Sequence, residues 1–229
     1  MYWMDLSEGD LMFYRDVFGW SSTVDAFTLD GAVVAGHGAP AIPGSGPRWS
    51  LHVQVDDVAR VCAGADVLAG PVDSAMGKTA VLADPAGAAF VVREPGRQAS
   101  CLHKPMALTW AELCTNDLAG ARTFYSGLFG WNPIDIVMEM PAGKVDYAVF
   151  MAGEAEVGGV LPAEGAFAPA EPSYWLPYVE VTDADAIAAR AVEAGGAVPV
   201  APFDIPRIGR VALLAGRSGE TLAVMQMPS

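Results

Sequence analysis

Two carboxylates stand in short apolar segments of the sequence, where an unpaired charge would be costly. Asp5 lies in Trp3-Met4-Asp5-Leu6, and Glu112 lies in Trp110-Ala111-Glu112-Leu113. A buried carboxylate without a partner is strongly disfavoured, so each acid either forms an ion pair or serves a ligand as acceptor or general base. Arg93 is a candidate partner for Asp5, in which case that pair would be structural.

The other polar candidates lie on segments where polar and apolar residues alternate. His52 is a lone histidine that acts either as a structural residue or as a general base. Trp3 and Trp110 either stack on a planar ligand or fill the core. The predicted catalytic residues are Glu112, Asp5 and His52; the predicted ligand-binding residues are Trp110, Cys114, Tyr178, Glu180, Trp3, Gln54 and Arg93.

A duplication of the chain positions the two acids. Each acid lies in an opening strand, followed by an aspartate that caps a helix and by the pattern Phe-Tyr…Phe-Gly-Trp, which ends at Trp20 and again at Trp131. Six residues separate Asp117 from Phe124, but only two separate Asp10 from Phe13, so we expect the first helix to be about one turn shorter.

Each half continues with a second strand and helix. Alternation predicts strands over 49–55 and 175–181. We expect a helix over about 58–69, ended by Gly70-Pro71, and another from Asp183 that stops at Gly195-Gly196. The predicted organisation is a first domain over 1–97 with a shortened first unit, a linker over 98–106, and a second domain over 107–229.

Composition limits the partners. The net charge is −14 with 13 Lys and Arg residues in 229, which disfavours nucleic acid and anionic membranes. Three cysteines with no paired spacing favour reduced thiols, and the first motif begins at Trp3, so we expect a cytoplasmic protein without a leader. A homodimer remains open.

Four strand–helix–strand–strand–strand units, paired in two halves, resemble the vicinal oxygen chelate superfamily of glyoxalases, bleomycin-resistance proteins and extradiol dioxygenases. The resemblance is carried by the helix segment from Asp117 to Trp131 and by the turns Asp84-Pro85-Ala86-Gly87 and Arg217-Ser218-Gly219-Glu220. It implies an α+β fold of four βαβββ units in two tandem glyoxalase-like domains. Each domain would be a curved mixed-sheet cup with helices outside and ligand inside.

Period-two alternation then assigns the residues that face each cup. In the first half these are Trp3, Asp5, Ser7, Ser50, His52, Gln54, Ala89, Val91 and Arg93. In the second half they are Trp110, Glu112, Cys114, Leu176, Tyr178, Glu180, Thr221, Ala223 and Met225.

The resemblance also implies where metal-dependent members hold their ion. Those positions fall here on Trp3, Trp110, Ser50 or Leu176, Val91 and Ala223, and Trp, Val and Ala cannot bind a metal. We therefore expect no metal or other cofactor. A displaced divalent-metal site using Asp5 and His52, or Glu112 and Glu180, would need a third ligand.

The sequence thus predicts a metal-independent protein that binds an apolar or aromatic small molecule, in a resistance or carrier role. The second cup is favoured because its helix and loops are longer. An isomerase, lyase or hydrolase that tailors a secondary metabolite with Glu112 or Asp5 as general base is the alternative. A divalent-metal glyoxalase or dioxygenase is the second alternative, and whether any reaction is catalysed stays open.

Overall fold

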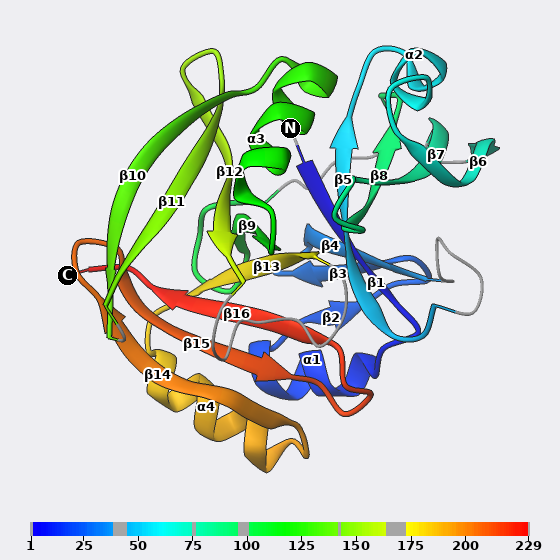
Figure 1. The fold of residues 1–229 in the computed structure, drawn as a ribbon. Coiled ribbons are helices and arrows are strands. Elements are labelled where there is room, and N and C mark those ends of the chain that lie inside the picture. Colours follow the sequence, from blue (N-terminus) through cyan, green and yellow to red (C-terminus); the bar gives the residue numbers. More distant parts are fainter. Residues whose placement is uncertain are drawn as a thin grey trace.

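The described part of the chain contains two mixed sheets of eight strands each, together with helices (Figure 1). The computed structural model describes residues 2–38, 45–74, 77–95, 101–141, 143–163 and 173–228. The first sheet has the order β2-β3-β4-β1-β5-β8-β7-β6, and the second has the matching order β10-β11-β12-β9-β13-β16-β15-β14. The predicted fold of two tandem glyoxalase-like domains is confirmed, whereas the domain boundaries themselves remain a prediction.

The elements of the first half lie between residues 2 and 93. They are β1 (Tyr2–Ser7), α1 (Leu11–Phe18), β2 (Ser21–Ser22), β3 (Ala26–Leu29), β4 (Ala32–Gly38), β5 (Arg48–Gln54), α2 (Val58–Cys62), β6 (Asp66–Ser74), β7 (Gly77–Ala83) and β8 (Ala89–Arg93).

The elements of the second half lie between residues 108 and 226. They are β9 (Leu108–Thr115), α3 (Leu118–Phe129), β10 (Asn132–Met140), β11 (Gly143–Ala152), β12 (Ala155–Pro162), β13 (Tyr174–Val181), α4 (Ala184–Glu193), β14 (Ala197–Ile205), β15 (Gly209–Ala215) and β16 (Thr221–Gln226).

The opening strands of the two units meet antiparallel at the centre of each sheet. β1 pairs with β5 so that Trp3 lies opposite His52, and β9 pairs with β13 so that Trp110 lies opposite Tyr178. The last strand of each unit pairs in parallel with the opening strand: β4 with β1, β8 with β5, β12 with β9, and β16 with β13. The registers of the two sheets therefore correspond residue by residue.

Local signals in the sequence explain the helix ends. The N-cap aspartates Asp10 and Asp117 accept backbone N–H groups of the first turn, and Gly19 and Gly130 end the helices at φ +73° and +71°. α1 has 8 residues and α3 has 12, so the predicted loss of one turn is confirmed.

The helix expected over 58–69 is wrong in its extent. α2 stops at Cys62, and β6 runs from Asp66 through Gly70-Pro71 to Ser74, paired with β7. Val67 and Leu68, which fall within the expected helix, are 42% and 44% exposed on this edge strand. Pairing with β7 satisfies the backbone of this segment and overrides its helical pattern.

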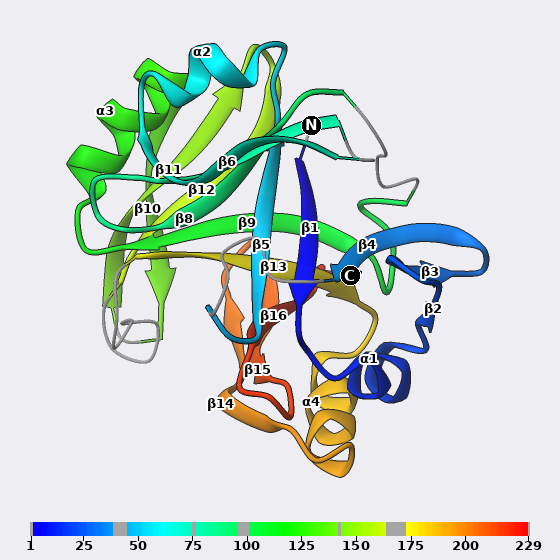
Figure 2. The same cartoon turned by 90° about the vertical axis from the view of Figure 1, so that its right-hand side faces the viewer.

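The helices lie outside the sheets, and α1 of the first half packs against α4 of the second half. Figure 2 shows these two helices side by side. None of the helices in the described part of the chain is long and apolar enough to cross a membrane.

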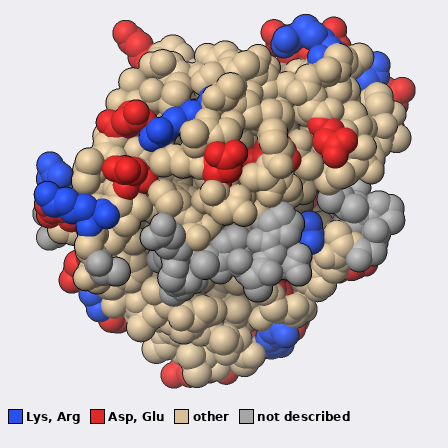
Figure 3. Space-filling model, viewed as in Figure 1, with Lys and Arg blue, Asp and Glu red and all other residues tan. Residues whose placement is uncertain are grey.

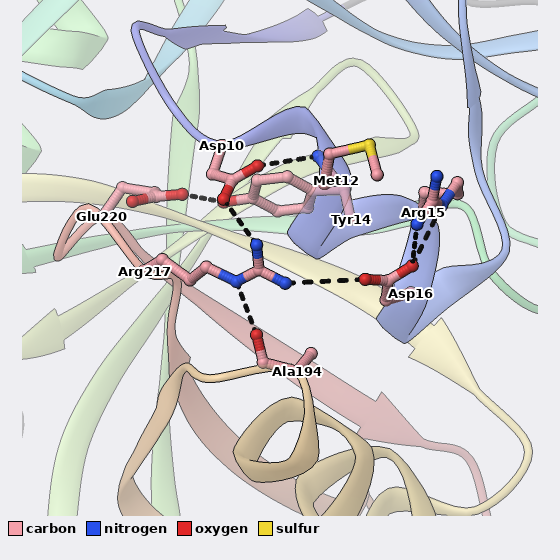
Figure 4. A network of polar contacts seen from close by, with 8 residues as sticks. All are labelled: Asp10, Met12, Tyr14, Arg15, Asp16, Ala194, Arg217 and Glu220. Atoms are coloured by element: carbon pink, nitrogen blue, oxygen red, sulfur yellow. Dashed lines mark hydrogen bonds and ion pairs between the residues drawn. The ribbon is translucent and has the colours of Figure 1, made fainter.

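Reciprocal tyrosine bonds join the halves. Tyr14 of α1 donates to Glu220 Oε1 at 2.9 Å, while Tyr125 of α3 donates to Asp84 Oδ2 at 3.2 Å. Each hydroxyl also accepts a tryptophan N–H, at 3.1 Å in both cases. Figure 4 shows the first of these contacts beside Arg217, which pairs with Asp10 at 2.8 Å. The closing turn of each half is therefore bound by the opening helix of the other.

The buried apolar residues form two clusters that follow strand alternation. One cluster packs beneath the helices of both halves and contains Leu6, Leu51, Leu113 and Val224. The other lies inside the second sheet and contains Cys114, Leu176, Tyr178 and Ala223, with Met225 packed against it. The predicted division of these residues between helix side and cup side agrees with the structure.

Candidate functional site

The second sheet curves into a cup whose inner face is apolar. Its edge strands β10 and β14 lie next to each other, so the sheet almost closes on itself (Figure 1). Partly buried apolar side chains line the wall: Met138, Met140, Val145, Val149, Val200, Phe203, Ile208 and Met225. The inner face of this cup is therefore an apolar surface, the kind that dominates small-molecule sites.

Glu112 lies inside this cup on β9 and is only 5% exposed. Tyr147 donates to its Oε1 at 2.9 Å, and Tyr178 donates to its Oε2 at 2.6 Å. The indole N–H of Trp110 in turn donates to the Tyr147 hydroxyl at 3.1 Å, which leaves the hydrogen of that hydroxyl for Glu112. Both carboxylate oxygens are thus held by neutral phenols.

Burial dominates the electrostatics of this site. It raises the pKa of Glu112, and the two tyrosine hydrogen bonds offset only part of that rise. The pKa values of Tyr147 and Tyr178 are raised by burial and by the nearby Glu112. Burial, followed by Glu112, also raises the pKa of Cys114, so this thiol stays protonated and is a poor nucleophile.

A glycine makes room for the cluster. Gly159 of β12 is the parallel partner of Glu112. A Cβ at this position would lie 1.6 Å from the Tyr147 hydroxyl and 3.0 Å from Trp110 Nε1. The glycine is therefore required by the close approach of these side chains.

The first cup places an acid in the same way. Asp5 of β1 faces Gly36 of β4, where a Cβ would lie 1.8 Å from Asp5 Oδ1. The indole N–H of Trp3 donates to Asp5, and His52 Nε2 lies 3.2 Å from Asp5 Oδ2. Arg93 lies over the Trp3 ring, 5.7 Å from its centroid.

The protein supplies positive charge in this first cup. Arg93 is buried, and burial lowers the pKa of its guanidinium group. The electrostatic interaction with Asp5 offsets part of this lowering. Burial lowers the pKa of His52, with Asp5 acting in the opposite direction. The predicted pair of Asp5 and Arg93 is thus brought together, with His52 as a third member.

The remaining predicted site residues differ in exposure and in position along their strands. Trp3 is 1% exposed, whereas Trp110 is half-buried at the open side of its cluster. Glu180 and Gln54 lie at the ends of β13 and β5, paired with Met225 and Arg93 respectively. Their proposed ligand contacts remain predictions.

Two residues inside the second cup were not among the site residues predicted from the sequence. Tyr147 binds Glu112, and Tyr174 shares a hydrogen bond with Cys114. Alternation of Val145, Tyr147 and Val149 along β11 is the signal that would have placed Tyr147 inside the cup.

The donor set does not fit a metal ion. Among the described residues, no group of three His, Cys, Asp or Glu side chains is placed to hold one. The residues at the superfamily's ligand positions include Trp3, Trp110, Val91 and Ala223, which have no suitable donor atoms. The displaced pairs considered above supply only two donors each, so no chemical step is assigned to a metal here.

Known proteins share the sequence along nearly the whole chain. CFP32 of Mycobacterium tuberculosis, whose name assigns it provisionally to the glyoxylases, is 34% identical over 98% of this chain and 93% of its own. The anthracycline biosynthesis protein DnrV of Streptomyces peucetius is 32% identical over 98% of this chain and 92% of its own.

Solved structures share the fold at low identity. The Mn(II)-bound glyoxalase of Novosphingobium aromaticivorans matches with a TM-score of 0.61 and 16% identity, over 98% of this chain and 80% of its own. The 2,2′,3-trihydroxybiphenyl 1,2-dioxygenase of Sphingomonas wittichii matches with a TM-score of 0.61 and 14% identity, over 98% and 88%. The model of the glyoxalase/bleomycin resistance protein/dioxygenase superfamily matches residues 107–224. With its tandem cups and these relatives, the chain belongs to the glyoxalase/bleomycin resistance protein/dioxygenase superfamily.

Proposed function

We propose that this protein binds an apolar or aromatic metabolite in its second cup without a metal ion. The observation that carries the proposal is the buried Glu112, held by Tyr147 and Tyr178 at the base of an apolar wall. A few placed polar groups within an apolar concavity are typical of small-molecule sites. The apolar wall supplies contact area, and the carboxyl group orients the ligand.

Aromatic side chains on the open side of the cluster support a planar ligand. Trp110 and Tyr174 are both half-buried, whereas Glu112, Tyr147 and Tyr178 beneath them are buried. Indole and phenol rings offer flat faces with large contact area. Trp110 is therefore our choice for the wall against which a ring system stacks.

The names of the relatives suggest which compounds to try first. DnrV and DauV, both 32% identical to this chain, are named for anthracycline biosynthesis. A fused aromatic ring system matches both that chemistry and the apolar cup. We infer a role for this chain in the handling of such a secondary metabolite, as a carrier or resistance protein.

Titration with 1-hydroxyanthraquinone, followed by calorimetry, tests the proposal. We expect saturable binding that Trp110→Ala weakens at least about tenfold, because a lost stacking contact is worth roughly 1 to 2 kcal/mol. Trp3→Phe in the first cup is the matched control and should leave this affinity unchanged. Binding that survives Trp110→Ala intact would place the ligand elsewhere.

Catalysis is the alternative, with Glu112 as a general base. The specific observation in its favour is the raised pKa of Glu112, because burial tunes a carboxyl group toward proton transfer near neutral pH. If a converted metabolite is found, the rate should rise with pH through one carboxyl ionisation, and Glu112→Gln should abolish that limb. A rate unaffected by Glu112→Gln would exclude this role.

A cytoplasmic location and a homodimer are further parts of the proposal. Light scattering on the eluting protein measures the oligomeric state directly. Elemental analysis of freshly purified protein tests the metal-independent mode, because a stoichiometric divalent ion would contradict it.

A further inference from the structure

Among the residues that the structure describes, no cation balances the charge of Glu112. Its two hydrogen-bond partners are phenols, and no Lys or Arg among the described residues forms an ion pair with it. A carboxylate removed from water strongly favours a positive partner, and neutral donors compensate it only in part. A positive charge on the ligand would supply the partner that Glu112 lacks in the described part of the chain.

The first cup shows which group would provide that balance. Arg93 of β8 lies next to Gln54 in the parallel register, and Met225 of β16 lies next to Glu180 in the same register. Arg93 and Met225 are therefore equivalent positions. The first cup carries its own cation beside Asp5, whereas the second cup has an uncharged methionine in the corresponding place.

Aromatic rings surround the unbalanced acid. Trp110, Tyr147 and Tyr178 are joined to it through hydrogen bonds, and Tyr174 lies close enough to interact electrostatically with it. The negative faces of such rings attract ammonium groups, and cages of this kind bind substituted ammonium ions. In the first cup, the protein itself places a cation on a ring, since Arg93 lies over Trp3.

We propose that the second cup recognises a ligand carrying a protonated or quaternary amine, whose ammonium group sits against Glu112 among Trp110, Tyr147, Tyr174 and Tyr178. The proposal rests on the proposed function, because it concerns the same cup and adds the charge of its ligand. Anionic ligands are disfavoured by Glu112 and by the net charge of −14, and Figure 3 shows acidic side chains spread over one face of the molecule.

The ionisation of Glu112 adds an expected pH dependence. Burial raises the pKa of this carboxyl group, so part of it is protonated at pH values where an exposed glutamate is charged. An ammonium ligand binds the charged form, so its affinity should rise with pH until Glu112 is fully ionised. An uncharged ligand of the same shape should lack this rise.

Two probes of equal shape test the proposal: phenyltrimethylammonium and its carbon isostere tert-butylbenzene. Their affinities for the intact protein are measured by NMR titration from about pH 5 to about pH 8. This range begins just above the ordinary pKa of a glutamate side chain. We expect the cation to bind roughly tenfold to thirtyfold more tightly than the isostere, the factor supplied by a desolvated cation–π contact.

Three variants locate the effect. Glu112→Gln keeps the shape of the side chain and should remove the preference for the cation. Met225→Arg places a cation where the first cup has one and should also remove the preference. Met225→Leu is the uncharged control and should retain it. Circular dichroism establishes that each variant is folded.

The outcomes separate this proposal from the proposed function. Equal affinity for the two probes, or a cation preference that persists in Glu112→Gln, overturns the amine proposal. If 1-hydroxyanthraquinone binds in a manner that depends on Trp110 while the cation is not preferred, the proposed function stands and only the amine proposal falls. Absence of binding by all three compounds contradicts both.

Discussion

The two cups of this protein hold an acid on the same strand position but neutralise it differently. In the first cup, Asp5 lies beside His52 and interacts with Arg93. In the second cup, Glu112 lies beside Tyr178, and the position of Arg93 is taken by Met225. The first acid therefore has a cationic partner within the protein, whereas the described partners of the second are neutral phenols.

The outer strands of the two sheets also differ in length. β2 and β3 have only 2 and 4 residues, whereas β10 and β11 have 9 and 10. Tyr147, which binds Glu112, lies three residues before Phe150, and the residue three before the matching Phe27 is Val24, which is 93% exposed. A duplication thus produced one cup with short outer strands and an acid near Arg93, and one cup with long outer strands and an acid bound by tyrosines.

The largest expected effect concerns the first cup's internal cation. Arg93→Met should lower the free energy of unfolding by about 3 kcal/mol, because it removes a buried cation that interacts electrostatically with Asp5. Met225→Leu, at the equivalent position, should cost less than about 1.5 kcal/mol. Urea unfolding of both variants measures the difference, and equal costs would contradict the contrast between the cups.

The glycine beside each acid should be less replaceable in the second cup. Gly159→Ala should cost about 2.5 kcal/mol, because the new methyl group meets the buried Tyr147 hydroxyl. Gly36→Ala should cost about 1.5 kcal/mol, because the partly exposed Asp5 can move aside but the new methyl group would also lie 2.8 Å from the buried Trp3 ring. Thermal unfolding at one pH compares them; a larger cost at Gly36 would show that the first cup is the more tightly packed.

The reciprocal tyrosines at the interface should also be unequal. Tyr14→Phe should cost about 2 kcal/mol, because Glu220 Oε2 has no hydrogen-bond partner and Oε1 would lose the Tyr14 bond. Tyr125→Phe should cost about 1 kcal/mol, since Asp84 keeps the backbone N–H groups of Ala86 and Ala88. Denaturant midpoints of the two variants, each compared with the wild type, test this order.

The pH dependence of stability should have opposite signs in the two cups. The folded-state pKa of Glu112 is raised above its ordinary 4.5, so this residue's contribution to stability falls as pH rises from about that value. The folded-state pKa of His52 is lowered below 6.5, so its contribution falls as pH drops below that value.

Single variants isolate these contributions. The unfolding free energy of each variant is compared with that of the wild type from about pH 4 to about pH 8. This range brackets the ordinary pKa values of glutamate and histidine side chains. Glu112→Gln should remove the loss at higher pH, and His52→Gln should remove the loss at lower pH. Parallel curves for wild type and variant would contradict the assigned burial.

Much of this fold follows from local signals in the sequence. Strand alternation assigned Leu6 and Leu113 to the helix side and Tyr178 to the cup. The spacing after Asp10 and Asp117 gave the different lengths of α1 and α3. These features were predictable because they depend on the period of a strand and the rise of a helix.

The extent of α2 was not predictable in the same way. Its continuation through Val67 and Leu68 fits a helix locally, but β7 offers this segment a backbone partner along an open sheet edge. Likewise, alternation along β11 gives the face on which Tyr147 lies, but only the pairing of β11 with β12 brings it to Glu112. Pairing between distant segments supplies hydrogen bonds that local propensity cannot include.

By itself, the sequence determined the duplication, the superfamily fold, an acid in each opening strand, and the absence of suitable metal donors at the superfamily's ligand positions. Only the tertiary structure decided which acid is balanced by the protein. That outcome depends on the side chains that neighbouring strands place beside each carboxylate: His52 and Arg93 in one cup, Tyr147 and Tyr178 in the other. The cost of burying a charge depends on those neighbours, which are assembled from separate parts of the chain.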